Sequence, residues 1–222
     1  NLHMLGDVMA LPRLEYVLAS HNYVTSIEGD VGEALKTLDL AHNPLTRAQL
    51  SAPVPSSLTR LDLSHANLVT INESLFRSVP ELRQLVLDHN QFASLPPLGS
   101  LGKLECLSCA TNALTQLPDS IGSLRALQRL DVRDNNLRSL PASVWRCQSL
   151  RVLNASSNIL SSLPMPDGGA PDTMPLAASL VHLSVADNRL SDDVFAVLMH
   201  LPRLELLNPV SYTHLTLPTK RI

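Results

Sequence analysis

Aromatic residues are scarce in this chain of 222 residues: Phe, Trp and Tyr together make up 3% of it. So few rings offer little surface on which the bases of a nucleic acid can stack. The net charge of −3 also lacks the basic excess that marks proteins binding nucleic acid or anionic membranes. The composition therefore argues against a nucleic-acid partner.

Long apolar runs and cysteine clusters are missing as well. No apolar run reaches the roughly 18–20 residues of a membrane-spanning helix, so we predict no membrane span. The three cysteines, without a cysteine-rich cap, are typical of a reducing, intracellular setting. The chain shows no nucleophile–base pair, phosphate-binding loop or cluster of metal ligands. We therefore predict that it contains no catalytic, cofactor-binding or metal-binding residue.

What the chain does contain is one frame, Leu-x-x-Leu-x-Leu-x-x-Asn-x-Leu, repeated along its length. The full copies begin at Leu14, Leu35, Leu58, Leu82, Leu104, Leu127, Leu150 and Leu180, and a partial copy opens at Leu204. Successive starts lie 21 to 24 residues apart, except for a step of 30 between Leu150 and Leu180. This period is typical of a leucine-rich repeat. The longer step indicates an insertion, and its Gly- and Pro-rich residues 165–175 predict a loop.

The frame predicts an α/β leucine-rich repeat solenoid over residues 1–208, with a curved parallel β-sheet on the concave face. Frame positions one, four, six and eleven point into the core, and the residues between them face the open side. One repeat cannot bury its leucines alone, so neighbouring repeats must stack. We expect turns and short helices on the convex face, with helices at 72–77 and 191–199, the second capped by Ser191.

Asparagine recurs at frame position nine, where the chain leaves the strand. An amide both donates and accepts, so we predict a structural ladder that bridges the backbones of neighbouring repeats. The ladder consists of Asn22, Asn43, Asn90, Asn112, Asn135, Asn158 and Asn188. The third repeat departs from it, since Ala66 holds the position and Asn67 comes one residue late. Either a water fills the gap there or the turn shifts by one residue.

Histidine and cysteine also recur at set places in the frame. Position eight carries His21, His42, His65 and His89 in consecutive repeats. A histidine column is a candidate metal site or pH sensor, but stacked rings do not form a closed tetrahedral ligand set, so we interpret the column as a common way to end this strand. Cys106 and Cys109 have Cys-x-x-Cys spacing, yet frame positions three and six face opposite sides. We therefore expect no zinc or redox site there.

The variable residues of the concave face predict a protein-binding surface. The candidate contacts are Arg60, Asp62, Arg83, Asp88, Arg129, Asp131, Arg133 and Asp134. They mix both signs of charge over the middle repeats. A solvated face needs charges in any case, so these residues are equally compatible with a bare soluble surface.

Four stretches resemble the leucine-rich region of fungal adenylate cyclases: residues 85–97, 130–145, 150–158 and 179–195. The most specific of them contains Ala-Asp-Asn-Arg-Leu at 186–190, followed by Asp192 and Asp193, directly after the Pro- and Gly-rich insertion. The resemblance covers about residues 10–208.

This resemblance implies an interaction module of a larger signalling enzyme that makes cyclic AMP. In that family the repeats receive activated Ras, so a Ras-type small GTPase is the implied partner. Mg²⁺ and ATP are implied only for a cyclase domain outside this chain, and no catalytic residue is carried over. The implied setting is cytoplasmic, at the inner face of the plasma membrane through partners. Two alternatives stay open: the repeats of a PH-domain-type protein phosphatase, and a non-enzymatic Ras-pathway scaffold.

The last residues break the repeat. Residues 210–219 match, in one reading frame, the translation of the transposase end and adapter used to prepare sequencing libraries. We therefore predict that 209–222 is a non-native tail. The chain also starts within the pattern and without Met, so we expect it to be a piece of a longer protein.

Overall fold

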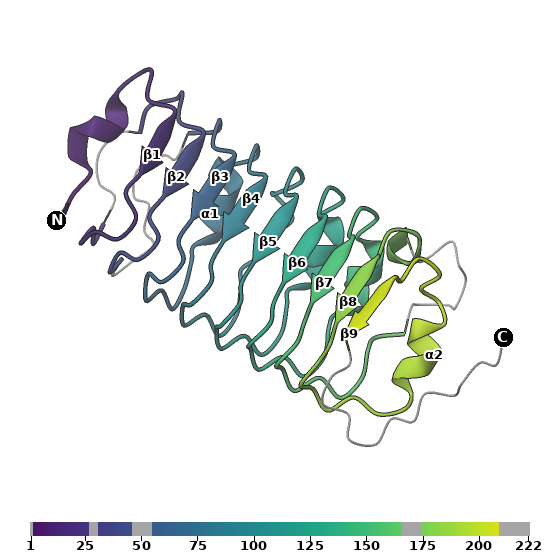
Figure 1. Ribbon diagram of the computed structural model, residues 1–222. Helices are drawn as coiled ribbons and strands as arrows, with labels where there is room; N and C mark the ends of the chain where they lie inside the picture. The colour runs from purple at the N-terminus through teal and green to yellow at the C-terminus, as the bar shows by residue number, and fades with distance from the viewer. Residues whose placement is uncertain (1, 27–30, 46–54, 166–174, 209–222) are drawn as a thin grey trace.

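The computed structural model describes residues 2–26, 31–45, 55–165 and 175–208, and these form a solenoid with one parallel sheet (Figure 1). The sheet runs in chain order from β1 to β9. The strands are β1 (Tyr16–Leu18), β2 (Thr37–Asp39), β3 (Arg60–Asp62), β4 (Gln84–Val86), β5 (Cys106–Ser108), β6 (Arg129–Asp131), β7 (Val152–Asn154), β8 (His182–Ser184) and β9 (Leu206–Asn208). Each strand occupies frame positions three to five, which confirms the predicted fold class.

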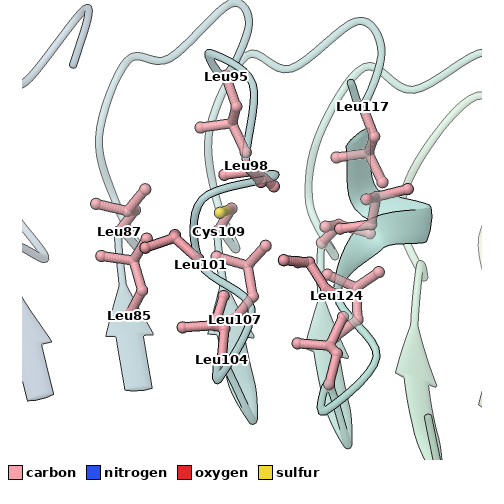
Figure 2. Close-up of a cluster of buried hydrophobic side chains, with 14 of the residues drawn as sticks. Leu85, Leu87, Leu95, Leu98, Leu101, Leu104, Leu107, Cys109, Leu117 and Leu124 are labelled. Atoms are coloured by element: carbon pink, nitrogen blue, oxygen red, sulfur yellow. The ribbon is translucent and has the colours of Figure 1, made fainter. Parts of the chain in front are cut away.

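The register of the sheet follows the frame. Leu61 pairs with Leu85 and Leu85 with Leu107, so position four always meets position four. These leucines are fully buried, while their strand neighbours at positions three and five lie on the open side. Figure 2 shows Leu85, Leu107 and Cys109 in one buried layer with Leu98 and Leu101 from the connection between β4 and β5.

Turns and short helices cover the convex side, as predicted. They are the 3-10 helices η1 (Gly6–Ala10), η2 (Asp119–Ser123), η3 (Ala142–Arg146) and η5 (Pro175–Ala178) and the α-helices α1 (Glu73–Ser78) and α2 (Val194–Leu198). Pro118 and Pro141 stand directly before η2 and η3, where a fixed φ suits a helix start and a missing N–H costs nothing. In α1 the Asn72 side chain accepts from the Ser74 N–H at 2.9 Å.

The start of α2 differs from the prediction. The helix begins at Val194, Asp193 holds the cap position, and no side-chain cap hydrogen bond forms. The Ser191 hydroxyl instead lies 3.4 Å from an Asp193 carboxylate oxygen. The prediction of Ser191 as the cap was therefore wrong, because its hydroxyl bonds to the Asp193 carboxylate rather than to a helix N–H. Of the predicted insertion loop, 165–175, residues 166–174 lie outside the described residues and Pro175 begins η5, and the predicted tail, 209–222, lies wholly outside them.

Asparagines at position nine join neighbouring repeats through both ends of the amide. In the sixth repeat, Asn135 Nδ2 donates to the carbonyls of Cys109 at 2.9 Å and Val132 at 3.1 Å. Its Oδ1 accepts from the Leu114 N–H at 2.9 Å. One buried side chain thus satisfies backbone groups of two repeats that have left the strand ladder. Asn43, Asn90, Asn112, Asn158 and Asn188 make equivalent bonds.

The third repeat closes its gap with the next asparagine along the solenoid. Asn90 Oδ1 accepts from both the Ala66 N–H at 3.1 Å and the Leu68 N–H at 2.9 Å. In the preceding repeat, the Leu45 N–H donates to the Asn43 carbonyl of its own turn at 2.8 Å. Leu68 keeps its buried place at position eleven, so the turn is not shifted by a residue. Asn67 adopts a positive φ of 57°, which asparagine tolerates.

Position eight has a left-handed backbone in every full repeat. Its φ lies between 52° and 60° at His21, His42, His65, His89, Thr111, Asp134, Ser157 and Asp187. Histidine and aspartate are among the side chains enriched in this region. The bend turns the chain out of the strand and aligns the side chains of position eight along one edge of the sheet.

Candidate protein-binding face

Two strands of the concave face carry the charged candidates. Arg60 and Asp62 flank the buried Leu61 on β3, and an Arg60 guanidinium nitrogen lies 3.7 Å from an Asp62 carboxylate oxygen. Arg60 also donates to the Gln84 side-chain oxygen on β4 at 3.2 Å. These contacts tie the guanidinium to β3 and β4 while leaving the side chain half exposed.

The second charged strand is β6, which carries Arg129 and Asp131. Burial raises the pKa of the Asp131 carboxyl, and the neighbouring Arg133 opposes the shift. The Arg133 N–H donates to Asp131 Oδ1 at 3.2 Å, and its guanidinium lies 3.7 Å from Asp131 Oδ2. The Asp131 carboxyl is therefore partly desolvated, and Arg133, which follows the strand, holds it in place.

The remaining candidates lie at the two ends of the strands. Arg83 precedes β4 and pairs with Glu105 of the next repeat. Asp88 follows β4 and accepts from the Ser108 hydroxyl and the Ala110 N–H, each at 2.7 Å. Asp88 thus supports the backbone of the adjacent repeat. Asp134, also beyond its strand, lies 3.2 Å from the Thr111 hydroxyl.

The structure therefore spreads the eight candidates over the sheet and its two edges. Between the charged strands β3 and β6 lie β4 and β5, whose concave residues Gln84, Val86, Cys106 and Ser108 carry no formal charge. Three strand steps separate Arg60 from Arg129, about 14 Å at the usual spacing. The face is thus a neutral centre flanked by two Arg–Asp strands. The sequence pattern indicated the variable positions but not this arrangement.

Two protein-family models match the sequence of this solenoid. The model described as "Leucine-rich repeat region" matches residues 67–215, and the one described as "Leucine rich repeat" matches residues 33–92. The chain belongs to the leucine-rich repeat family. The repeated frame, the strand register and the asparagine hydrogen bonds described above are consistent with this family.

Its relatives include two fungal enzymes. The adenylate cyclase of Mycosarcoma maydis is 39% identical over 105 residues, which is 47% of this chain, and that of Podospora anserina is 43% identical over 90 residues, which is 40% of this chain. The matches span about 4% of the length of either cyclase. Among solved structures, YopM from Yersinia enterocolitica superposes with a TM-score of 0.66 at 28% identity, over 89% of this chain and 38% of YopM. The resemblance to fungal cyclases is confirmed.

The cysteines of this leucine-rich repeat chain are free thiols on different sides of the sheet. Cys106 is half buried on the concave strand β5, whereas Cys109 is fully buried in the core. Their predicted opposite orientation is confirmed. Burial raises the pKa of both thiols, and it raises that of Cys147 to about 12. At neutral pH these side chains stay protonated, which disfavours metal binding and nucleophilic chemistry.

The four histidines of position eight stack as a column at the strand exit. The ring centroids of successive pairs from His21 to His89 are 4.0, 3.9 and 4.0 Å apart, and the rings are within 12° to 14° of parallel. Burial lowers the pKa of His65, and so do the neighbouring His89 and His42, while Asp88 opposes them. Across the described ranges, no group of three or more His, Cys, Asp or Glu is placed to hold a metal ion.

One hollowed edge of the sheet was not predicted from the sequence. At the strand entry, Arg151 lines two adjoining hollows, and Arg203 lines the second of them. Their positions lie just outside the strand residues, where the alternation rule gives no signal. No helix in the described part of the chain is long and apolar enough to cross a membrane.

Proposed function

We propose that this solenoid is the Ras-responsive interaction module of an adenylate cyclase and that its concave face receives a small GTPase in the GTP state. The observation that carries the proposal is the identity of 39% and 43% to two fungal adenylate cyclases. In this proposal ATP and Mg²⁺ are bound by a cyclase domain outside this chain, which makes cyclic AMP. The module works in the cytoplasm and reaches the inner face of the plasma membrane through its partner.

The concave face supports this role by its shape and charge. Its rigid strands present Arg60 and Arg129 on either side of the neutral centre, each with an aspartate on the same strand. Charges arranged in this way raise association rate and specificity more than affinity. The partner would place a predominantly uncharged patch against Gln84, Val86, Cys106 and Ser108 and complementary charges on both flanks.

The direct test is binding of the full chain to Ras loaded with a GTP analogue or with GDP, measured by calorimetry. We expect binding only in the GTP-analogue state, and weaker binding as salt rises, because exposed charges are screened. Arg60→Ala combined with Arg129→Ala should weaken binding about tenfold or more, as loss of charged contacts at an interface does.

Arg77→Ala is the matched control. Arg77 lies on the convex helix α1, where it pairs with Glu73 at 2.8 Å. Its loss should leave binding unchanged. Equal binding to both nucleotide states, or none to either, would remove the switch-receiver role. Sequencing of the gene beyond residue 208 is an independent test, since a phosphatase domain or a stop codon there would favour the alternatives.

A further inference from the structure

The strand-entry edge of the sheet carries charged residues at frame position two and directly before the frame. In the first five repeats six of these charges pair between neighbours, while Arg13, before the first frame, is in no ion pair within the described residues. The pairs are Lys36 with Glu15 at 2.9 Å, Lys103 with Glu81 at 2.6 Å, and Arg83 with Glu105. Every basic side chain in these pairs is neutralised by an acid one repeat away.

At the same positions the sixth, seventh and eighth repeats carry no acid, and the ninth carries Glu205 at position two. At position two, Arg151 stands between Gln128 and Val181, neither of which is charged. Before the frame, Arg203 follows Ser179 of the preceding repeat. Neither arginine forms an ion pair within the described residues, although Glu205 lies two residues from Arg203. The edge therefore carries uncompensated positive charge.

The short side chains at this edge also open space. Two adjoining hollows, of about 260 and 440 Å³, share Gln128, Arg151 and Val181 as lining residues. The first extends to Arg129 and His182 on β6 and β8, and the second extends to Arg203 past small serine and alanine side chains. Among the residues that the structure describes, no acidic side chain lines either hollow.

We propose that this arginine groove, defined by Arg129, Arg151 and Arg203, binds an extended acidic segment of a partner protein. Guanidinium groups bind carboxylates through two parallel hydrogen bonds, and these charge-assisted bonds are the stronger kind. Arg151 and Arg203 belong to the seventh and ninth repeats, about 10 Å apart at the usual strand spacing. Carboxylates about three residues apart on an extended chain span that distance, at about 3.3 Å per residue.

The lining favours a peptide over a nucleic acid. Among the described residues, His182 is the one ring that lines either hollow, so successive stacked bases would find no series of aromatic side chains. The small side chains Ser149, Ala178 and Ser179 leave room for a backbone between the arginines. The groove lies outside the neutral centre of the concave face, but it shares Arg129 with the proposed GTPase site. Its test therefore changes only Arg151 and Arg203, so that its failure and the failure of the GTPase site can be told apart.

The test uses the full chain and a fluorescein-labelled peptide with Glu at every third position and Ser between, and the Gln-for-Glu peptide is its matched partner. Fluorescence anisotropy at low salt should show binding of the Glu peptide at least about tenfold tighter than the Gln peptide. Arg151→Gln combined with Arg203→Gln should abolish that difference. Arg151→Lys should bind the Glu peptide more tightly than Arg151→Gln does, but less tightly than the wild type. Lysine keeps the positive charge but cannot form the two parallel hydrogen bonds of a guanidinium group.

Arg83→Gln is the control variant, since Arg83 occupies position two but is already paired with Glu105. It should bind the Glu peptide as the wild type does, and melting by circular dichroism should show that every variant is folded. The proposal is overturned if the Glu and Gln peptides bind alike or if the double variant binds as the wild type does. It is also overturned if a single-stranded oligothymidine competes more strongly than unlabelled Glu peptide, because the groove would then be a nucleic-acid contact.

Discussion

The first four repeats and the four that follow share one core but differ at both ends of their strands. At the strand exit, the first four place histidines in the left-handed position, and the next four place Thr111, Asp134, Ser157 and Asp187 there. At the strand entry, ion pairs in the N-terminal part give way to Arg151 and Arg203, which form no ion pair with any residue that the structure describes. The buried positions tolerate little change because each leucine packs against its neighbours, whereas the edges meet solvent and vary freely.

The asparagine ladder shows the same contrast inside the core. It is interrupted at Ala66 in the N-terminal half and continuous from Asn90 to Asn188 in the rest. The interruption is tolerated because Asn90 Oδ1 accepts two N–H groups, and Leu45 turns to its own repeat. The lesson is that a missing bridge costs little only where neighbouring groups can take over its bonds.

The largest expected effect comes from breaking the ladder where no neighbour compensates. Asn135→Ala removes both the donor and the acceptor that bridge two repeats, and we expect a loss of about 1–3 kcal/mol in the free energy of unfolding. Urea denaturation of the variant and the wild type measures it. Asn136→Ala, on the exposed side, is the control and should cost little. Equal losses at the two positions would contradict the frame assignment.

A smaller loss is expected on acidifying the histidine column. Burial and the stacked His89 and His42 place the folded pKa of His65 below its unfolded value of 6.5. The unfolded chain therefore binds the proton more readily, so stability is complete above pH 6.5 and falls as the pH drops below it. Melting temperatures recorded across this range should decline. The charged groups that act on the pKa of this ring are His89, His42 and His21, which lower it, and Asp88, which raises it.

His65→Asn separates the column from other acid-sensitive groups. Asparagine tolerates the left-handed backbone, so the fold should persist while the decline with acid becomes shallower. Thr111→His sharpens the comparison from the other side, since φ at Thr111 is 53° and the ring would extend the column beyond His89. That variant should steepen the decline. An unchanged slope in both variants would mean that the column does not control acid stability.

A third, weaker effect concerns the ion pairs of the strand entry. Glu105→Gln leaves Arg83 unpaired and makes this part of the edge resemble the arginine groove. Both side chains are largely exposed, so the stability change should stay below about 1 kcal/mol in thermal melts. Binding of the Glu peptide should increase slightly. A large destabilisation would show that the pair has a structural role that its exposure does not suggest.

The smallest expected effect is a gain in the free energy of unfolding on replacing Asp131. Burial raises the folded pKa of Asp131 above 3.8, so the stability linked to its protonated form is present below pH 3.8 and lost as the pH rises through the folded pKa. Asp131→Asn removes that loss at neutral pH and keeps an acceptor for the Arg133 N–H. Because the group is partly exposed, we expect a gain of at most about 0.5 kcal/mol in urea denaturation. Asp134→Asn, on the exposed edge, should change less, and a loss for Asp131→Asn would contradict the prediction.

Much of this molecule was predictable from the frame alone. The strand positions, the buried leucines and the opposite orientation of Cys106 and Cys109 all followed from side-chain alternation. The start of α2 did not, because Ser191 contacts Asp193 and leaves the helix N-terminus without a side-chain cap. Local hydrogen-bond competition of this kind leaves no periodic signal in the sequence.

The candidate site was predictable only as a set of variable positions. Its division into two Arg–Asp strands around Gln84, Val86, Cys106 and Ser108 depends on which repeats lie side by side. Asp88 looked like a surface charge, yet it accepts from the Ser108 hydroxyl and the Ala110 N–H of the next repeat. Whether a charge is free for a partner depends on contacts across repeats, which spacing within one repeat does not specify.

By itself, the sequence determined the period, the core and the direction of every strand residue. A leucine that recurs in a fixed frame is most stable when it packs against the equivalent leucines of the neighbouring repeats. Only the tertiary structure decided how Ala66 is compensated, which charges neutralise one another and where Arg151 and Arg203 open a groove. These features arise from side chains about one repeat apart that meet at the edges, where many rotamers are allowed and stacking selects among them.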